Sequence, residues 1–152
     1  MQETVKVMVG DAVVWSSEMT VREPMPGERA VTKAYDIAHL FSSVAAYPQE
    51  VFAVAYLNGA HFPIETRWVT VGLVDQNQVH PREVFGPAME LRAAAIVMAH
   101  NHPSGTLTAS VEDVAITNRL KKAGELLGIR VLDHVILTPD GQYLSMRQDG
   151  HF

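Results

Sequence analysis

Two short apolar runs constrain the fold of this chain more than any other feature of the sequence. Residues 51–57 are apolar at the positions that would face both sides of a strand, and residues 95–99 form a second brief apolar run between helical patterns. Runs of this kind are typical of strands that lie inside a sheet and are covered on each face. The two runs therefore predict a central sheet with helices packed against both sides.

Helical and extended patterns alternate along the rest of the chain, which predicts the α/β or α+β class but does not fix the order of the strands. The clearest helix covers residues 110–127, because Ser110 can cap its start and Gly128 can end it. After residue 81, Gly86-Pro87 is expected to break or restart a helix. The other predicted elements are helices over residues 34–45 and 81–94 and strands over residues 59–74, 129–137 and 143–146.

The first 28 residues are predicted to be separate from the rest. Residues 4–9 and 12–16 are strand-like and flank Gly10-Asp11, a turn signal, whereas residues 22–27 hold two prolines and a glycine, as linkers do. We therefore predict a short β-hairpin and linker over residues 1–28 and one larger domain over residues 29–152. An exposed edge of this hairpin could pair with a second copy, so a homodimer is one expected assembly.

Composition excludes several classes of protein. The chain has 152 residues, of which 47% are hydrophobic and 19% charged, which suits one folded domain rather than a disordered chain. It has no cysteine, which excludes disulfides, thiolate metal sites and a cysteine nucleophile. No apolar run approaches the roughly 20 residues that span a bilayer, so we expect a soluble, cytoplasmic protein. The net charge of −5 argues against binding duplex DNA through its phosphates.

The residues with the most chemical content follow the second apolar run. His100 and His102 are two positions apart at the end of a predicted strand, so their imidazole side chains point to the same face of the sheet. Asp113 heads the apolar stripe of the predicted helix, where an unpaired charge would be costly. The stripe is predicted to consist of Ile116, Leu120, Ala123 and Leu127. Two neutral imidazoles and one carboxylate suit Zn²⁺ and leave a fourth position for a water, which would become a hydroxide nucleophile near neutral pH.

Each of these features also has a simpler interpretation. A pair of histidines two residues apart is often just exposed or hydrogen-bonded. Asp113 follows Ser110 by three positions, as the carboxylate of a capping box does, and the two roles can coexist on different oxygens. Spacing alone therefore leaves both a metal site and a hydrogen-bonded cluster open.

The same residues resemble the signature of the JAMM, or MPN-plus (JAB), metallopeptidases. In that signature His-x-His is followed after seven residues by Ser and after two more by Asp, and this sequence has that spacing without a gap at His100, His102, Ser110 and Asp113. The flanking runs are similar to the bacterial RadC-like branch. These runs are residues 80–85, 100–105 and 132–134, and the resemblance covers residues 31–145.

The resemblance implies a fold, a metal and an activity. The fold would be the α/β domain of the MPN/JAB proteins, a mixed sheet flanked by helices that is similar to the cytidine deaminases. His100, His102 and Asp113 would bind Zn²⁺, and the domain over residues 29–152 would be a metallohydrolase. Its substrate would be a peptide or protein, cleaved at a peptide or isopeptide bond by a water that the metal activates.

The resemblance also implies roles for two more residues. Ser110 would stabilise the oxyanion that forms when the scissile carbonyl is attacked. Glu50 directly precedes the first apolar run, which is the place of the family's catalytic glutamate, and it would carry the proton between water and leaving group. Without the resemblance, spacing does not single out Glu50. Other glutamates that could serve as the base are Glu65, Glu83 and Glu90.

Two other functions and three other residues remain open. The RadC-like branch carries a DNA-repair label and often an N-terminal helical segment, but residues 1–28 resemble a hairpin and the chain is acidic, so binding to nucleic acid is not expected. A role near nucleic acid or in mobile elements is the first alternative, and a scaffold that retains metal without turnover is the second. Asp133 and His134 are expected to form a structural pair, with a place behind the metal ligands as the alternative, and His80 is expected to shape the start of a helix.

Overall fold

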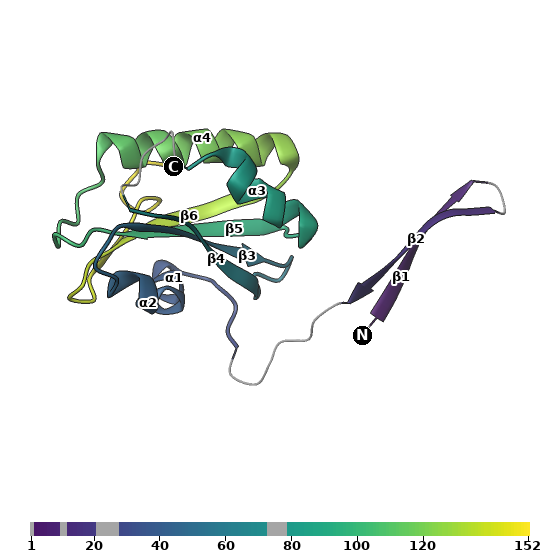
Figure 1. Ribbon diagram of the computed structural model, residues 1–152, viewed down its shortest axis with the longest axis horizontal. Helices are drawn as coiled ribbons and strands as arrows, with labels where there is room; N and C mark the ends of the chain where they lie inside the picture. The colour runs from purple at the N-terminus through teal and green to yellow at the C-terminus, as the bar shows by residue number, and fades with distance from the viewer. Residues whose placement is uncertain (1, 10–11, 21–27, 73–78) are drawn as a thin grey trace.

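A computed structural model describes residues 2–9, 12–20, 28–72 and 79–152 (Figure 1). Five strands form one mixed sheet in the order β4-β3-β5-β6-β7. Only β5 and β6 are parallel, and the other three pairings are antiparallel. The strands are β3 (Val51–Leu57), β4 (Pro63–Val71), β5 (Ala95–Asn101), β6 (Arg130–Leu137) and β7 (Tyr143–Ser145).

The two apolar runs are interior strands of this sheet, as predicted. Every residue of β3 and of β5 is buried, which is why these segments tolerate apolar residues at consecutive positions. Two helices, α1 (Ala34–Leu40) and α2 (Ser42–Ala45), cover one face, and α3 (Pro81–Glu90) and α4 (Val111–Leu127) cover the other (Figure 1). The predicted α/β architecture, a mixed sheet flanked by helices, is confirmed.

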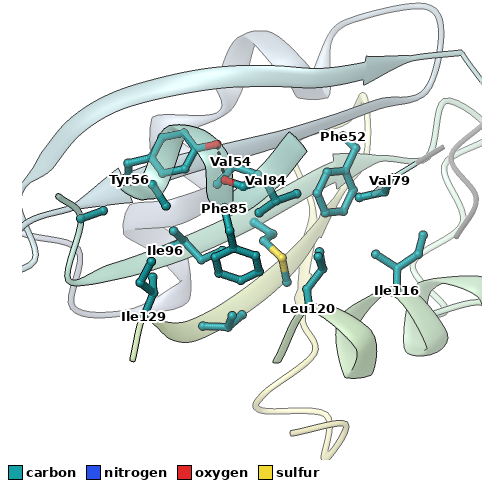
Figure 2. Close-up of a cluster of buried hydrophobic side chains, with 14 residues drawn as sticks. Phe52, Val54, Tyr56, Val79, Val84, Phe85, Ile96, Ile116, Leu120 and Ile129 are labelled. Carbon is teal, nitrogen blue, oxygen red and sulfur yellow. Dashed lines mark hydrogen bonds between the residues drawn. The ribbon is translucent and has the colours of Figure 1, made fainter. Parts of the chain in front are cut away.

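The core has two halves, because successive side chains of β3 point to opposite faces of the sheet. One half lies between the sheet and helices α3 and α4, and it contains Phe52 and Tyr56 together with Phe85 (Figure 2). The other half lies between the sheet and helices α1 and α2, and it contains Val51 and Val135. The face of β3 that carries Phe52 is also the face on which the candidate site lies.

The predicted N-terminal hairpin is confirmed as a pair of strands. β1 (Gln2–Val9) and β2 (Ala12–Thr20) pair antiparallel and form a second, two-stranded sheet. The predicted turn at Gly10-Asp11 and the linker over residues 22–27 lie outside the described residues.

Two predicted helices differ from the structure. Residues 34–45 form two helices rather than one, because the chain leaves helical geometry at Phe41, which is thereby buried in the core. Conversely, α3 continues through Gly86-Pro87, where a break was expected, and ends at Glu90 rather than residue 94. Gly86 has no Cβ to crowd the proline ring, and Phe85 and Ala88 on either side are buried. Arg92 then takes a left-handed conformation that cannot continue the helix.

The helix α4 is confirmed with its caps, but its buried stripe ends earlier than predicted. Leu127 is 44% exposed, and Gly124 occupies the last buried position of the helix instead. A Cβ at Gly124 would lie 2.4 Å from the carbonyl oxygen of Ile129, so only glycine permits this close approach of α4 to the start of β6. Within the described part of the chain, no helix combines the length and apolar character needed to traverse a membrane.

Candidate metal centre

Three predicted residues converge where β5 ends and α4 begins. The Nε2 atom of His100 lies 2.9 Å from Oδ1 of Asp113, and the Nε2 atom of His102 lies 3.3 Å from Oδ2 of the same carboxylate. The two Nε2 atoms are 2.8 Å apart. His100 and Asp113 are buried, and His102 is partly exposed. The structure therefore brings together two imidazoles and one carboxylate beside solvent.

The start of α4 holds the Asp113 carboxylate in place. Ser110 is the N-cap: its Oγ accepts a hydrogen bond from the Asp113 amide at 3.0 Å, and its own amide donates to Oδ2 of Asp113 at 2.7 Å. Burial alone would raise the pKa of Asp113, but hydrogen bonds from His100, His102 and Ser110 outweigh it and hold the pKa well below its usual range. The predicted capping box thus forms, and its carboxylate still faces both imidazoles.

The Nδ1 atom of His102 contacts the backbone carbonyl of Thr106 at 2.7 Å. A carbonyl can only accept, so Nδ1 carries the proton and Nε2 of the neutral ring carries a lone pair. The hydrogen bond to Asp113 raises the pKa of His102; burial opposes this shift, and the Thr106 carbonyl and the charges of Asp113 and Glu50 add to it. In the neutral ring the lone pair of His102 faces His100 and Asp113, and a metal ion that binds there replaces the proton that Asp113 favours.

The donor set fits Zn²⁺. The donor atoms of the three residues are 2.8, 2.9 and 3.3 Å apart, somewhat closer than the roughly 3.3–3.6 Å between neighbouring ligands of a tetrahedral ion with bonds of about 2.0–2.2 Å. A carboxylate and two imidazole lone pairs are all acceptors, so they need a positive charge between them. Nitrogen and oxygen donors in this number suit zinc, which keeps three protein ligands and one open position in catalytic sites.

Glu50 lies next to this cluster. The antiparallel register pairs Phe52 with His100, and two further steps along each strand bring Glu50 level with His102. The negative charge of Glu50 contributes to the raised pKa of His102, which agrees with this placement. Glu50 is partly exposed and its backbone carbonyl accepts from Gly72 at 2.8 Å. Glu50 is therefore close enough to the three converging residues for its charge to act on His102.

Asn101, between the two histidines, fixes the segment that carries Glu50. Its Oδ1 accepts from the Val51 amide at 2.7 Å, and its Nδ2 donates to the carbonyls of Tyr47 and Gln49 at 3.0 and 2.9 Å. These three hydrogen bonds hold the backbone on both sides of Glu50 in place. Asn101 had no role predicted from the sequence, although an amide at the end of a buried apolar run must satisfy its hydrogen bonds and is a usable signal.

His134 also belongs to this region, and its ring has a different partner from the Asp133 carboxylate. Asp133 is structural: Oδ1 accepts from the amides of His134 and Arg147, and Oδ2 accepts from Ser145 Oγ at 2.5 Å. The His134 ring instead contacts Nδ1 of His100 at 2.8 Å, so it lies behind a candidate ligand. Burial lowers the pKa of His134 well below its usual value and keeps the ring neutral.

Three of the remaining candidates, His80, Glu65 and Glu83, have local partners. His80 caps α3 by accepting from the Arg82 amide, as expected. Glu83 pairs with Arg82 at 3.4 Å, and Glu65 pairs with Arg67 at 2.6 Å. These contacts give Glu65 and Glu83 structural explanations that do not involve the converging histidines.

The fold and the three converging residues define an α/β protein with a candidate metal site. Residues 31–151 match the family model described as the RadC-like JAB domain, and the chain belongs to this family. The resemblance seen in the sequence is thereby confirmed and extends six residues further than predicted, from 145 to 151.

Relatives of this chain carry the name UPF0758 protein. One from Pelobacter propionicus is 51% identical over 102 residues, which cover 67% of this chain and 44% of the relative. Another from Methanospirillum hungatei is 41% identical over 139 residues, 88% of this chain and 61% of the relative. A third from Staphylococcus haemolyticus is 41% identical over 123 residues, 80% and 54% of the two chains. The chain thus spans about half the length of these relatives.

Proposed function

We propose that this protein is a zinc-dependent hydrolase of peptide or isopeptide bonds. The observation that carries the proposal is the convergence of His100, His102 and Asp113, with His102 partly exposed and Glu50 close enough for its charge to raise the pKa of His102. Membership of the RadC-like JAB family supports it. The donor set, and not the family name alone, favours zinc over ions that prefer oxygen ligands.

The residues around the site have distinct roles in such a reaction. Zn²⁺ would supply a Lewis acid that lowers the pKa of water and polarises the scissile carbonyl. Glu50 accepts the proton of the attacking water and passes it to the leaving nitrogen as the C–N bond breaks. The Ser110 hydroxyl accepts a hydrogen bond from the backbone amide of Asp113, so its own proton is free to be donated to the oxyanion of the substrate. Ser110 is exposed enough for a substrate to reach it.

The test combines metal analysis with hydrolysis by the full chain. Purified protein is assayed for zinc and for cleavage of internally quenched peptides and of lysine-branched isopeptides. We expect one zinc per chain, loss of zinc in His100→Ala, and retention of zinc with a loss of about 100-fold or more in cleavage in Glu50→Gln. Glu83→Gln is the matched control, because Glu83 pairs with Arg82 on α3 and should keep full activity.

Two results would contradict the proposal. Wild-type protein without stoichiometric zinc, together with His100→Ala that changes neither metal content nor cleavage, would remove the metal site. Zinc-loaded Glu50→Gln with unchanged behaviour in every assay would instead indicate a scaffold that retains metal without turnover.

A further inference from the structure

We infer that Thr117 and His134 are positioning residues that hold His100 in the tautomer with a free lone pair on Nε2. The inference rests on the proposed zinc site and adds to it two residues that make no contact with the metal themselves. It concerns metal affinity, which can be measured without knowledge of the substrate.

A continuous chain of hydrogen bonds starts at the back of His100. Its Nδ1 lies 2.8 Å from Nε2 of His134, and Nδ1 of His134 lies 2.7 Å from Oγ1 of Thr117. The Thr117 hydroxyl in turn donates to the backbone carbonyl of Asp113 at 2.7 Å. The chain thus begins at one candidate ligand and ends on the backbone of another. The residues that form it are at most 3% exposed.

The direction of these hydrogen bonds decides which nitrogen of His100 is free. A Thr117 hydroxyl that donates to Asp113 accepts from Nδ1–H of His134. With its proton on Nδ1, the His134 ring has a bare Nε2, which accepts from Nδ1–H of His100. The Nε2 atom of His100 is left with a lone pair facing Asp113 and His102, which is the state that binds a metal ion.

The opposite direction uses the same number of protons. In that arrangement the Thr117 hydroxyl donates to His134, each ring carries its proton on Nε2, and Nε2–H of His100 points at the Asp113 carboxylate. The second arrangement gives up the hydrogen bond from Thr117 to the Asp113 carbonyl, so that 2.7 Å contact favours the first arrangement, as a metal ion on Nε2 of His100 would.

The surroundings leave Thr117 and His134 without an obvious replacement. The Phe52 ring, drawn in Figure 2, contacts the His134 ring edge-on at a centroid distance of 5.4 Å. The Sδ atom of Met146 lies 3.4 Å from Oγ1 of Thr117. Water is a poor substitute in a packed apolar environment, because it needs room and several polar partners. By contrast, His102 is oriented by a backbone carbonyl, which no side-chain substitution removes.

The test measures zinc affinity by competition with a chromophoric chelator at fixed pH. Thr117→Val keeps the shape but loses the hydroxyl, and we expect zinc to bind about 10- to 100-fold more weakly. Thr117→Ser, the matched control, keeps the hydroxyl and should remain within about threefold of wild type. In nitrogen-15 spectra of the zinc-loaded wild type, His134 should carry its proton on Nδ1.

A second pair of variants covers the case in which Thr117→Val does not fold. The amide of His134→Gln can still accept from His100, whereas His134→Leu cannot, so the leucine variant should bind zinc at least tenfold more weakly than the glutamine variant. Unfolding of each chelator-treated variant by urea separates the two explanations. A purely structural role would lower the unfolding midpoint and leave zinc affinity unchanged.

The possible failures are distinguishable. Wild type that binds zinc, with Thr117→Val or His134→Leu binding it equally tightly, would overturn the inference and leave the proposed function intact. Protonation of His134 on Nε2 in the zinc-loaded protein would overturn it as well. Wild type that binds no stoichiometric zinc would overturn the proposed function, and this inference with it.

Discussion

Asp113 uses one carboxylate for two purposes. Oδ2 accepts the capping bond from the Ser110 amide, while Oδ1 faces the Nε2 atom of His100. The cap also places the carboxylate in the first turn of α4, where the partial positive charge of the helix end favours a negative group. The helix therefore fixes the position of a candidate ligand at little conformational cost.

Substitution at this position separates the two purposes. Asp113→Asn keeps an oxygen for the Ser110 amide but loses the negative charge, so we expect zinc affinity to fall at least 100-fold while α4 keeps its cap. Asp113→Ala loses both, and should be less stable than Asp113→Asn by about 1 kcal/mol. Chelator competition and urea unfolding measure the two effects. Equal zinc affinity in Asp113→Asn and wild type would show that the carboxylate is only a cap.

At the scale of the elements, Tyr56 ties β3 to α3. Its ring is fully buried in the core, and its hydroxyl donates to the backbone carbonyl of Val84 at 2.9 Å (Figure 2). Burial raises the pKa of Tyr56 from 10 to about 12. The folded protein therefore favours the neutral phenol more strongly than the unfolded chain does.

This shift predicts the direction of a pH dependence. Because the folded pKa lies above the unfolded value, the contribution of Tyr56 is complete below pH 10 and is lost as the pH rises toward 12, by at most about 3 kcal/mol. Urea unfolding of wild type and Tyr56→Phe at pH 8, 10 and 11 measures it. The stability of wild type relative to the variant should decline above pH 10, and a constant difference would be inconsistent with a raised pKa.

Some elements could be predicted from the sequence because their signals are local. The capping box at Ser110, the buried positions Ile116 and Leu120, and the left-handed Gly128 all lie within or beside α4, and each appears in the structure as expected. The exposure of Leu127 and the burial of Gly124 were not predictable in this way. They depend on how closely α4 approaches the start of β6, which is a contact between elements.

At the scale of the whole molecule, the same distinction applies to the site. His100 near the end of β5 and His102 just beyond it are two positions apart, and Asp113 follows at a characteristic spacing, so the sequence was enough to group them. His134 reaches the same place only because β6 lies parallel to β5, with Met98 and His134 as register partners. Strand order could not be derived from hydrophobic alternation, so a place for His134 behind the metal ligands was only the alternative to a structural pair with Asp133.

The position of Glu50 also depends on sheet topology. The pairing of β3 with β5 places residue 50 level with residue 102, although about fifty positions separate them in the chain. Only the resemblance to a known family pointed to Glu50 from the sequence. The pairing of Glu65 with Arg67 and of Glu83 with Arg82 now gives a structural reason to prefer it.

X-ray absorption at the zinc K-edge of the protein loaded with one equivalent of zinc tests the central claim most directly. We predict a four-coordinate ion with two imidazole nitrogens and oxygen ligands at about 2.0–2.2 Å, and loss of one imidazole contribution in His102→Ala. A spectrum without imidazole scattering, or one that His102→Ala leaves unchanged, would contradict a metal centre formed by His100, His102 and Asp113.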